Sequence, residues 1–226
     1  MANNVDQLKQ QVALAAVKYI QPYLKPDAII GVGTGSTADL FIDALSQHKQ
    51  QFKAAVASSK RSAERLRQHG ITVLDLNQVE TMPVYVDGAD EINPQLQMIK
   101  GGGGALTQEK IVASVAEHFV CIADHSKWVE TLGAFKIPLE VIDSAKQAVI
   151  RQLQHLGASQ VTERAGFISD NGHPILDAAG FALTDARELE QAINQIPGVV
   201  CCGLFAQKPA SVLLLAKPDG VQTISL

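Results

Sequence analysis

Apolar and polar residues alternate along the first half of the chain with two different periods. Residues 5–21 place apolar side chains at helical spacing and precede Pro22 and Pro26, so we expect an amphipathic helix that ends before the prolines. Shorter apolar runs alternate with helix-like segments and predict strands at 27–33, 54–59 and 71–76 and helices at 37–48 and 62–70. This alternation is typical of a parallel sheet that is covered by helices.

The alternation continues to residue 133. We expect strands at the start of 83–92, at 95–99 and at the start of 119–127, and a helix over 106–119. Four of the predicted strands lead into loops rich in glycine or charged residues. Open α/β sheets bind ligands at the carboxyl ends of their strands, so we expect these four loops to form one site.

A different pattern begins after Gly133. Strand-like and helix-like segments follow in the order β-α-β-β-α-β, and Asp170-Asn171-Gly172 between two apolar stretches predicts a hairpin. We therefore expect a smaller α+β domain at 134–207. The tail predicts two strands that return to the first domain, which then comprises 1–133 and 208–226.

Composition and charge exclude several classes of protein. Hydrophobic residues make up 46% of the chain, charged residues 19%, and the mean hydropathy is +0.08, which is typical of a folded, water-soluble protein. No apolar run reaches the roughly 20 residues of a membrane-spanning helix, and residues 1–11 lack a signal-peptide pattern, so we expect a cytoplasmic protein without membrane contact. The net charge of −4 and the lack of a basic run argue against a nucleic-acid partner. The histidines and cysteines show no metal-ligand spacing, so we expect no metal, and buried thiols.

The loop Gly31–Leu40, GVGTGSTADL, lies between a predicted strand and a predicted helix. It lacks the lysine of a nucleotide P-loop. Its Gly-x-Gly-x-x-Ala pattern matches the dinucleotide fingerprint, but the next strand ends without the required acid; Lys60 and Arg61 leave NADP as an alternative. A third interpretation is a monophosphate site, with backbone N–H groups of Gly35, Ser36 and Thr37 and hydroxyls of Thr34, Ser36 and Thr37 as donors. A plain turn with polar caps stays open as well.

Acidic and basic side chains gather in the next two loops. Asp87, Asp90 and Glu91 directly follow a predicted buried strand, and carboxylates so close repel one another unless a cation is near. Lys100, at the end of the next strand, is the obvious cation. Carboxylates and a lysine together can move protons between hydroxyl and carbonyl oxygens.

Lys100 also opens a run of glycines, Gly101 to Gly104, which is costly in conformational entropy. We expect the run to let the backbone approach a ligand closely, although a flexible loop is the simpler interpretation. Glu109 falls in the first turn of the following helix, where it is either a favourable N-terminal acid or a member of the site. Lys127 is either a solvated lysine or a partner of a phosphate or hydroxyl.

Four segments, GVGTGST, VDGADEIN, KGGGGALTQEK and ADHSK, with PGVVCCGLFA and KPDGV near the end, resemble the A-type ribose-5-phosphate isomerase family over essentially the whole chain. The resemblance implies an α/β fold: a Rossmann-like parallel-sheet domain with an inserted smaller α+β (ferredoxin-like) domain that supplies subunit contacts. It implies a homodimer or a dimer of dimers that interconverts D-ribose 5-phosphate and D-ribulose 5-phosphate through an enediolate. The reaction belongs to the non-oxidative pentose phosphate pathway and uses neither metal nor cofactor.

The resemblance also implies roles for individual residues. Glu109 corresponds to the base that carries a proton between carbons 2 and 1, and Asp87, Asp90 and Lys100 correspond to groups that assist ring opening and handle the oxygens. The implied substrate contacts are Thr34, Gly35, Ser36, Thr37, Asp87, Gly88, Ala89, Asp90, Lys100, Gly101, Gly102, Gly103, Lys127 and, on the first helix, Lys9.

Two departures from the family pattern stand out. Gly104 stands where the family has alanine and is expected to add freedom to the loop, and Lys60-Arg61 stands where less basic residues are expected. A sugar-phosphate sensor without chemistry would need neither Glu109 nor the acid and lysine set, so their joint presence disfavours it. An NADP-dependent oxidoreductase and an isomerase of another sugar phosphate stay open as alternatives.

Overall fold

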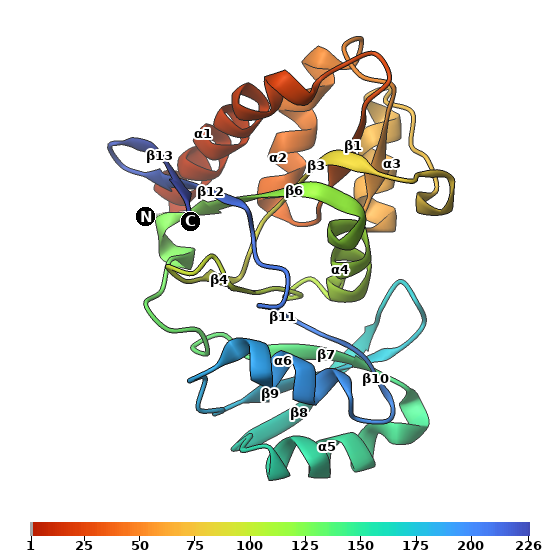
Figure 1. Cartoon of the computed structure of the whole chain (residues 1–226), viewed down its shortest axis with the longest axis vertical. Helices are drawn as coiled ribbons and strands as arrows, with labels where there is room; N and C mark the ends of the chain where they lie inside the picture. The colour runs from red at the N-terminus through yellow and green to blue at the C-terminus, as the bar shows by residue number, and fades with distance from the viewer. Residues whose placement is uncertain (1) are drawn as a thin grey trace. The chain divides into compact units, whose positions relative to one another are not determined.

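The computed structural model describes residues 2–226, which divide into two compact units (Figure 1). The first unit holds the chain up to Gly88 together with Gln108–Trp128 and Ala210–Leu226. The second holds Ala89–Thr107 and Val129–Pro209. The sequence assigned 89–107 to the first domain, whereas its contacts group it with the second unit, where its short strands find their pairing partners.

A six-stranded sheet in the order β13-β12-β6-β3-β1-β2 forms the first unit. Its strands are β1 (Ile29–Val32), β2 (Ala54–Ala57), β3 (Met82–Asp87), β6 (Ala116–Asp124), β12 (Val212–Lys217) and β13 (Gly220–Ser225). All neighbours pair in parallel except β12 and β13. Numbered among themselves, the parallel strands read 2-1-3-4-5, so the strand order reverses between β1 and β3. The predicted parallel sheet is confirmed, and a ligand is expected beside these two strands.

Helices cover this sheet (Figure 1). They are α1 (Ala2–Ile20), α2 (Ser36–Leu45), α3 (Lys60–Gln68) and α4 (Leu106–Val115), with 3₁₀ turns η1 (Gln21–Tyr23), η2 (Ser46–His48), η3 (Leu76–Gln78) and η4 (His125–Lys127). The predicted first helix packs against α2, β6 and β12, and its Leu8, Val12 and Ile20 are buried in one core with Ile30 and Val84 of the sheet. Burial of this apolar stripe explains why the helical periodicity of 5–21 was a reliable signal.

Two sequence predictions in this unit are wrong in detail. The apolar run 71–76 forms only an isolated bridge, Ala55 to Val73, because Asp75 then caps η3 and turns the chain away. The helix predicted over 106–119 ends at Val115, and its last residues begin β6, where Ala116 pairs with Met82. Strand pairing here overrides local helical spacing.

The second unit confirms the predicted β-α-β-β-α-β order. Its elements are β7 (Ile137–Val141), η5 (Asp143–Ala145), α5 (Lys146–His155), β8 (Gln160–Ile168), β9 (Pro174–Ala179), α6 (Ala186–Asn194) and β10 (Val199–Cys202). The antiparallel sheet runs β10-β7-β9-β8, which is the ferredoxin-like arrangement, and the predicted hairpin joins Ile168 to Pro174. Val149 and Leu153 of α5 and Ile193 of α6 are buried in this unit's core.

A small antiparallel sheet in the same unit carries part of the predicted site. It consists of β4 (Glu91–Ile92), β5 (Met98–Ile99) and β11 (Leu204–Phe205) in the order β11-β5-β4. Lys100 directly follows β5, and its N–H donates to the carbonyl of Gly203 at 2.8 Å. Glu91 is buried and accepts from the N–H groups of Gly133 and Phe135, so this acid anchors the chain.

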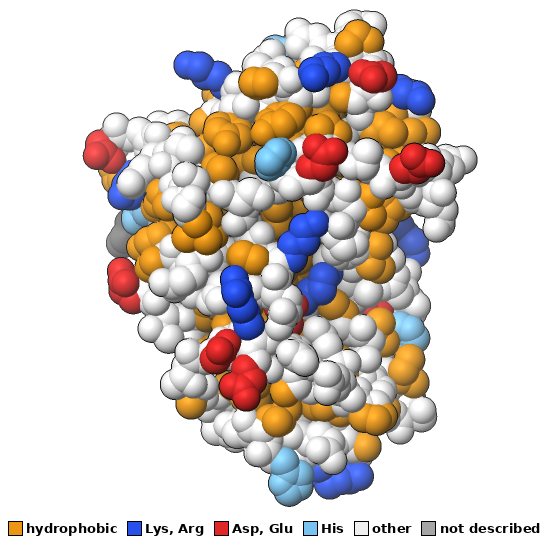
Figure 2. All heavy atoms as spheres, viewed as in Figure 1, with side chains coloured by type: hydrophobic (Ala, Val, Ile, Leu, Met, Phe, Trp, Pro, Cys, Tyr) orange, Lys and Arg blue, Asp and Glu red, His pale blue; other side chains and the backbone are white. Residues whose placement is uncertain are grey.

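The remaining composition-based expectations concern charge, thiols and membrane contact. Cys121, Cys201 and Cys202 are buried, as predicted. Acidic and basic side chains are interspersed on the face that Figure 2 shows. Within residues 2–226, no helix is long and apolar enough to cross a membrane.

Candidate active site

Asp87 ends β3 at the point where the strand order reverses, and both of its carboxylate oxygens are held. Oδ1 accepts the N–H of Thr34 at 3.0 Å and that of Gly88 at 2.7 Å, and Oδ2 accepts the hydroxyl of Tyr85 at 2.5 Å. Asp87 and Tyr85 share one face of the strand and are fully buried. A carboxylate with these partners has little freedom to rotate, so its orientation is set before any ligand binds.

Tyr85 connects this carboxylate to a second one. Burial raises the pKa of Tyr85 well above its usual value of 10.0, and the negative charges of Asp87 and then Glu109 raise it further. The phenol therefore keeps its proton and acts as a donor. Glu109 is buried in the same unit, and its charge reaches the phenol through the interior of the protein.

The loop between β1 and α2 contacts Asp87 through the N–H of Thr34. Gly35 has φ +118°, which favours glycine, and it precedes α2 without a side-chain cap on the helix N-terminus. The hydroxyl of Thr34 lies 2.9 Å from that of Ser58 and 3.3 Å from that of Ser62. The half-buried Thr34 is thus held by two neighbouring hydroxyls, whereas Ser36 is exposed at the first turn of α2. N–H groups at such a helix end attract anions.

Sequence reasoning missed three side chains of this cluster: Tyr85, Ser58 and Ser62. Tyr85 had a detectable signal, because residues two apart on a strand point to the same side and Asp87 is two residues on. The serines follow β2, whose carboxyl end lies at the same sheet edge as that of β1. Arg61, considered as a 2′-phosphate ligand, pairs instead with Asp39 of α2.

The other predicted residues of the first unit lie on three different elements. Glu109 sits in the first turn of α4 with only 4% of its surface exposed. Lys127 ends η4, which Asp124 caps by accepting from Ser126, and is half-buried. Lys9 lies on α1 with its ammonium 4.0 Å from Asp6, and its contact with a phosphate stays a prediction.

The second unit holds the remaining predicted residues around the glycine run. Asp90 Oδ2 accepts the N–H of Gly102 at 2.7 Å, and a Cβ on Gly102 would lie 2.7 Å from the other oxygen of Asp90. Lys100 is 2% exposed, and its Nζ lies 5.6 Å from the centre of the Phe205 ring. The close contact between Gly102 and the carboxylate of Asp90 explains why position 102 needs glycine.

Gly104 does not loosen the run, contrary to the expectation from the sequence. Its φ of +79° favours glycine, and a Cβ there would lie 2.1 Å from Cζ of Phe167. Its N–H donates to the carbonyl of Gly101 at 2.9 Å, which closes a turn. The fourth glycine therefore makes room for an aromatic ring of β8.

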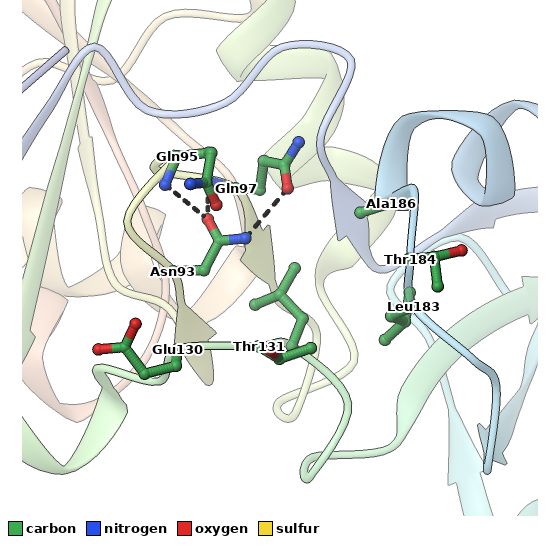
Figure 3. A pocket seen from close by; sticks show the side chains of 9 residues that line it. Asn93, Gln95, Gln97, Glu130, Thr131, Leu183, Thr184 and Ala186 are labelled. Atoms are coloured by element: carbon green, nitrogen blue, oxygen red, sulfur yellow. Dashed lines mark hydrogen bonds between the residues drawn. The ribbon is translucent and has the colours of Figure 1, made fainter.

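A separate polar pocket of about 180 Å³ lies within the second unit (Figure 3). The side-chain amide of Asn93 donates to Gln97, and its oxygen accepts the N–H groups of Gln95 and Gln97. These polar groups satisfy one another instead of converging on a ligand, and none of the predicted catalytic residues lines the pocket. We do not assign it to the site.

The predicted residues thus form two groups. Thr34–Thr37, Asp87, Gly88, Glu109, Lys127 and Lys9 belong to the first unit, and Ala89, Asp90 and Lys100–Gly103 to the second. Among residues 2–226 no group of three or more His, Cys, Asp or Glu side chains is arranged to hold a metal ion. An α/β protein with an uncapped helix end, buried carboxylates and a buried lysine carries the kinds of group that anion binding and proton transfer require.

Comparisons with known proteins identify the family. The family model described as ribose 5-phosphate isomerase A (phosphoriboisomerase A) matches residues 54–220. Ribose-5-phosphate isomerase A of Bordetella bronchiseptica is 60% identical over 218 residues, which cover 96% of this chain and 96% of that protein. The chain belongs to the ribose 5-phosphate isomerase A family, as its motifs predict.

Solved structures agree with this assignment. Ribose 5-phosphate isomerase A from Neisseria gonorrhoeae superimposes with a TM-score of 0.93 at 44% identity, covering 98% of this chain and 97% of that one. A D-ribose-5-phosphate isomerase in complex with phospho-erythronic acid gives a TM-score of 0.92 at 34% identity, covering 98% and 99%. The predicted α/β fold is confirmed.

Proposed function

We propose that this chain interconverts D-ribose 5-phosphate and D-ribulose 5-phosphate, with Glu109 as the group that carries the proton between carbons 2 and 1. The observation that carries the proposal is the buried carboxylate of Asp87, held by Tyr85 and two backbone N–H groups beside the reversal of strand order, with the buried Glu109 in the same unit. Membership of the family supports the reaction, and the roles of the individual residues follow from the resemblance of their motifs to the family.

The phosphate binds at the first turn of α2. Ser36 and Thr37 offer hydroxyls and N–H groups there, and Gly35 leaves the helix end open. Thr34 holds the loop in place through Ser58 and Asp87. Binding at a phosphate remote from the reacting carbons orients the sugar without taking part in the chemistry.

Proton transfer follows ring opening. The Glu109 carboxylate removes the proton from carbon 2 of the open aldose, and the electron pair of that bond passes to oxygen 1, which gives an enediolate with a proton still on oxygen 2. The same carboxylate then returns the proton to carbon 1, while the proton of oxygen 2 passes to oxygen 1, so oxygen 2 becomes the ketose carbonyl. The low exposure of Glu109 keeps water from competing for the proton.

Negative charge develops on the oxygens of the enediolate and needs fixed donors. The ammonium of Lys100, nearly inaccessible to water, is the strongest candidate in the second unit. Asp87 and Asp90 accept from substrate hydroxyls and assist ring opening, each carboxylate being held by backbone N–H groups.

A relative's ligand supports this assignment. Phospho-erythronic acid, which a D-ribose-5-phosphate isomerase binds, carries a carboxylate and a phosphate on a four-carbon chain. The two carboxylate oxygens resemble the pair of oxygens of the enediolate. We expect this compound to bind the present chain and to compete with ribose 5-phosphate.

We also propose a homodimer that works in the cytoplasm, with the second unit supplying subunit contacts. The edge strands β8 and β10 of that unit expose Ile168 and Val200, which supports an interface there. Light scattering coupled to size-exclusion chromatography measures the mass directly. A mass near the 24.1 kDa of one chain would contradict the dimer.

The function is tested by incubating purified protein with ribose 5-phosphate and a chelator and measuring ketose formation. Ketose is expected, and its absence with or without added divalent metal would reject the isomerase. Arabinose 5-phosphate, which differs at carbon 2, serves as the control for another substrate preference. Binding of NADP(H) in a titration, without ketose formation, would favour the oxidoreductase.

A further inference from the structure

We propose that Arg164 is a positioning residue of this enzyme, whose guanidinium orients the peptide groups of the glycine run and, through Gly102, the carboxylate of Asp90. The inference rests on the proposed function, in which this run and Asp90 meet the sugar phosphate. Arg164 lies on β8, more than 60 positions from Lys100 in the sequence, and no motif pointed to it.

The guanidinium is itself held firmly. Nε and Nη2 of Arg164 donate to the two carboxylate oxygens of Asp177 at 3.0 and 2.5 Å, and the side chains are only 19% and 17% exposed. The guanidinium carbon also lies 5.4 Å from the centre of the Phe167 ring. A bidentate pair that also stacks on a ring fixes the guanidinium plane.

The remaining nitrogen of this plane faces the glycine run. Nη1 of Arg164 donates to the carbonyl of Gly101 at 3.2 Å and to that of Gly102 at 3.0 Å. These are consecutive peptide groups, so one side chain fixes the direction of both. A run of glycines has no side chains with which to fix itself.

The first of these peptide groups links Arg164 to Asp90. In a trans peptide the carbonyl of Gly101 and the N–H of Gly102 point in opposite directions. Arg164 holds the carbonyl, and Asp90 Oδ2 accepts the N–H at 2.7 Å. Hydrogen bonds therefore hold both the carbonyl and the N–H of this peptide group. Any rotation of the group would also displace the carboxylate of Asp90.

The second peptide group presents a donor. Because Arg164 holds the carbonyl of Gly102, the N–H of Gly103 is directed away from the guanidinium. Gly103 is exposed, and a Cβ built on it meets nothing within 4 Å. This N–H is preorganised to donate to a substrate oxygen, and preorganised donors stabilise developing charge better than mobile ones.

Lysine cannot replace this arrangement, because one ammonium cannot bind Asp177 through two parallel bonds and still reach both carbonyls. The test therefore compares Arg164→Lys with the wild type. The matched control is Glu163→Gln, one position before Arg164 on the same strand. This substitution breaks the surface ion pair between Glu163 and Lys146 and leaves the contacts of the glycine run unchanged. Asp177→Asn, which retains Arg164 but weakens its anchor, is a second variant in case Arg164→Lys folds poorly.

Steady-state kinetics and amide hydrogen exchange provide independent readouts. We expect Arg164→Lys to lower kcat by about 10- to 100-fold, with a smaller change in KM, because misplacement of a catalytic group by about 1 Å has effects of this size. Exchange at Gly102 should accelerate, since its N–H loses a fixed acceptor. Asp177→Asn should shift both readouts in the same direction, and Glu163→Gln should shift neither.

Each result bears on the inference. Wild-type kcat and wild-type exchange at Gly102 in Arg164→Lys would overturn it, as would an equal loss of activity in Glu163→Gln, which would indicate general destabilisation of β8. If the wild type itself makes no ketose, the proposed function fails, and hydrogen exchange alone then decides whether Arg164 orders the glycine run.

Discussion

Gly33 lies so close to Asp87 that no other residue fits at this position. A Cβ built on Gly33 would lie 1.9 Å from Oδ1 of Asp87, well inside the 3.0 Å that such atoms essentially never approach. The carbonyl of Gly33 accepts the hydroxyl of Ser62 at 2.7 Å, so the loop cannot move aside without breaking that bond. The conformation of the first glycine loop is thus set by a carboxylate of the protein itself.

Gly33→Ala should therefore reduce activity more than a loop substitution ordinarily does. The new methyl group must displace Asp87 from the donors Thr34 and Gly88, and misplaced catalytic groups cost about 10²-fold in rate. Ketose formation and the free energy of unfolding measure the two effects. Wild-type values of both would show that the loop relaxes freely and that the proposed rigidity is incorrect.

Tyr85→Phe should remove the donor to Oδ2 of Asp87 while preserving the ring that packs 5.0 Å from Phe119. A buried acceptor left without its donor costs about 1–3 kcal/mol, so the free energy of unfolding should fall by that amount. kcat should fall as well, because Asp87 gains freedom. Tyr19→Phe on α1 is the control, and an equal effect there would contradict a specific role of Tyr85.

The pH dependence of stability gives a second measurement on the same variant. Burial raises the pKa of Tyr85 above its usual value of 10.0, so the unfolded chain loses this proton at lower pH than the folded protein does. This contribution to stability is complete below about pH 10 and is lost as pH rises further towards the folded pKa. The wild type should therefore lose its stability advantage over Tyr85→Phe above pH 10. An advantage that grows there would contradict the sign.

Glu109→Gln should leave folding intact and remove most turnover. The amide fills the same space on α4 but cannot accept the proton from carbon 2, and general acid-base groups contribute about 10²- to 10⁴-fold to rates. The matched control is Glu64→Gln, an exposed acid of α3 in the same unit. Near-normal ketose formation by the Glu109 variant would reject it as the proton carrier.

Periodicity and motifs predicted most of the fold, because most elements bury a regular apolar face. The predictions fail where contacts with residues distant in the sequence decide the local structure. The run 71–76 has strand-like composition but obtains only one bridge partner, at Ala55. Residues 116–119 read as a helix and become a strand because β3 offers them a pairing edge. Local sequence carries no information on such an edge.

The candidate site shows the same difference between residues that the local sequence reveals and residues that only distant contacts bring in. Residues inside glycine-rich or acidic motifs, such as Asp87 and Glu109, stand out by type and spacing. Ser62 and Arg164 do not, because each contacts a motif from another strand or helix. Gly104 was misjudged for the same reason: the sequence shows a fourth glycine, but only the fold reveals the ring of Phe167 beside it.

Gly104 and Phe167 should therefore be energetically coupled. Gly104→Ala introduces a side chain at φ +79° and forces it against the ring. Gly157→Ala is the matched control, because Gly157 also has a positive φ, +104°, but has nothing within 4 Å of its Cβ position. The control should lose about 1–2 kcal/mol of unfolding free energy from backbone strain alone, and Gly104→Ala should lose more.

Phe167→Val tests the steric part of that loss. In the double variant Gly104→Ala/Phe167→Val, the smaller side chain of β8 makes room for the new methyl group, while the backbone strain at Gly104 stays. The double variant should be more stable than the sum of the single losses predicts, by about 0.5–3 kcal/mol for residues in contact. Additive losses in chemical unfolding would show that the ring does not require glycine at this position.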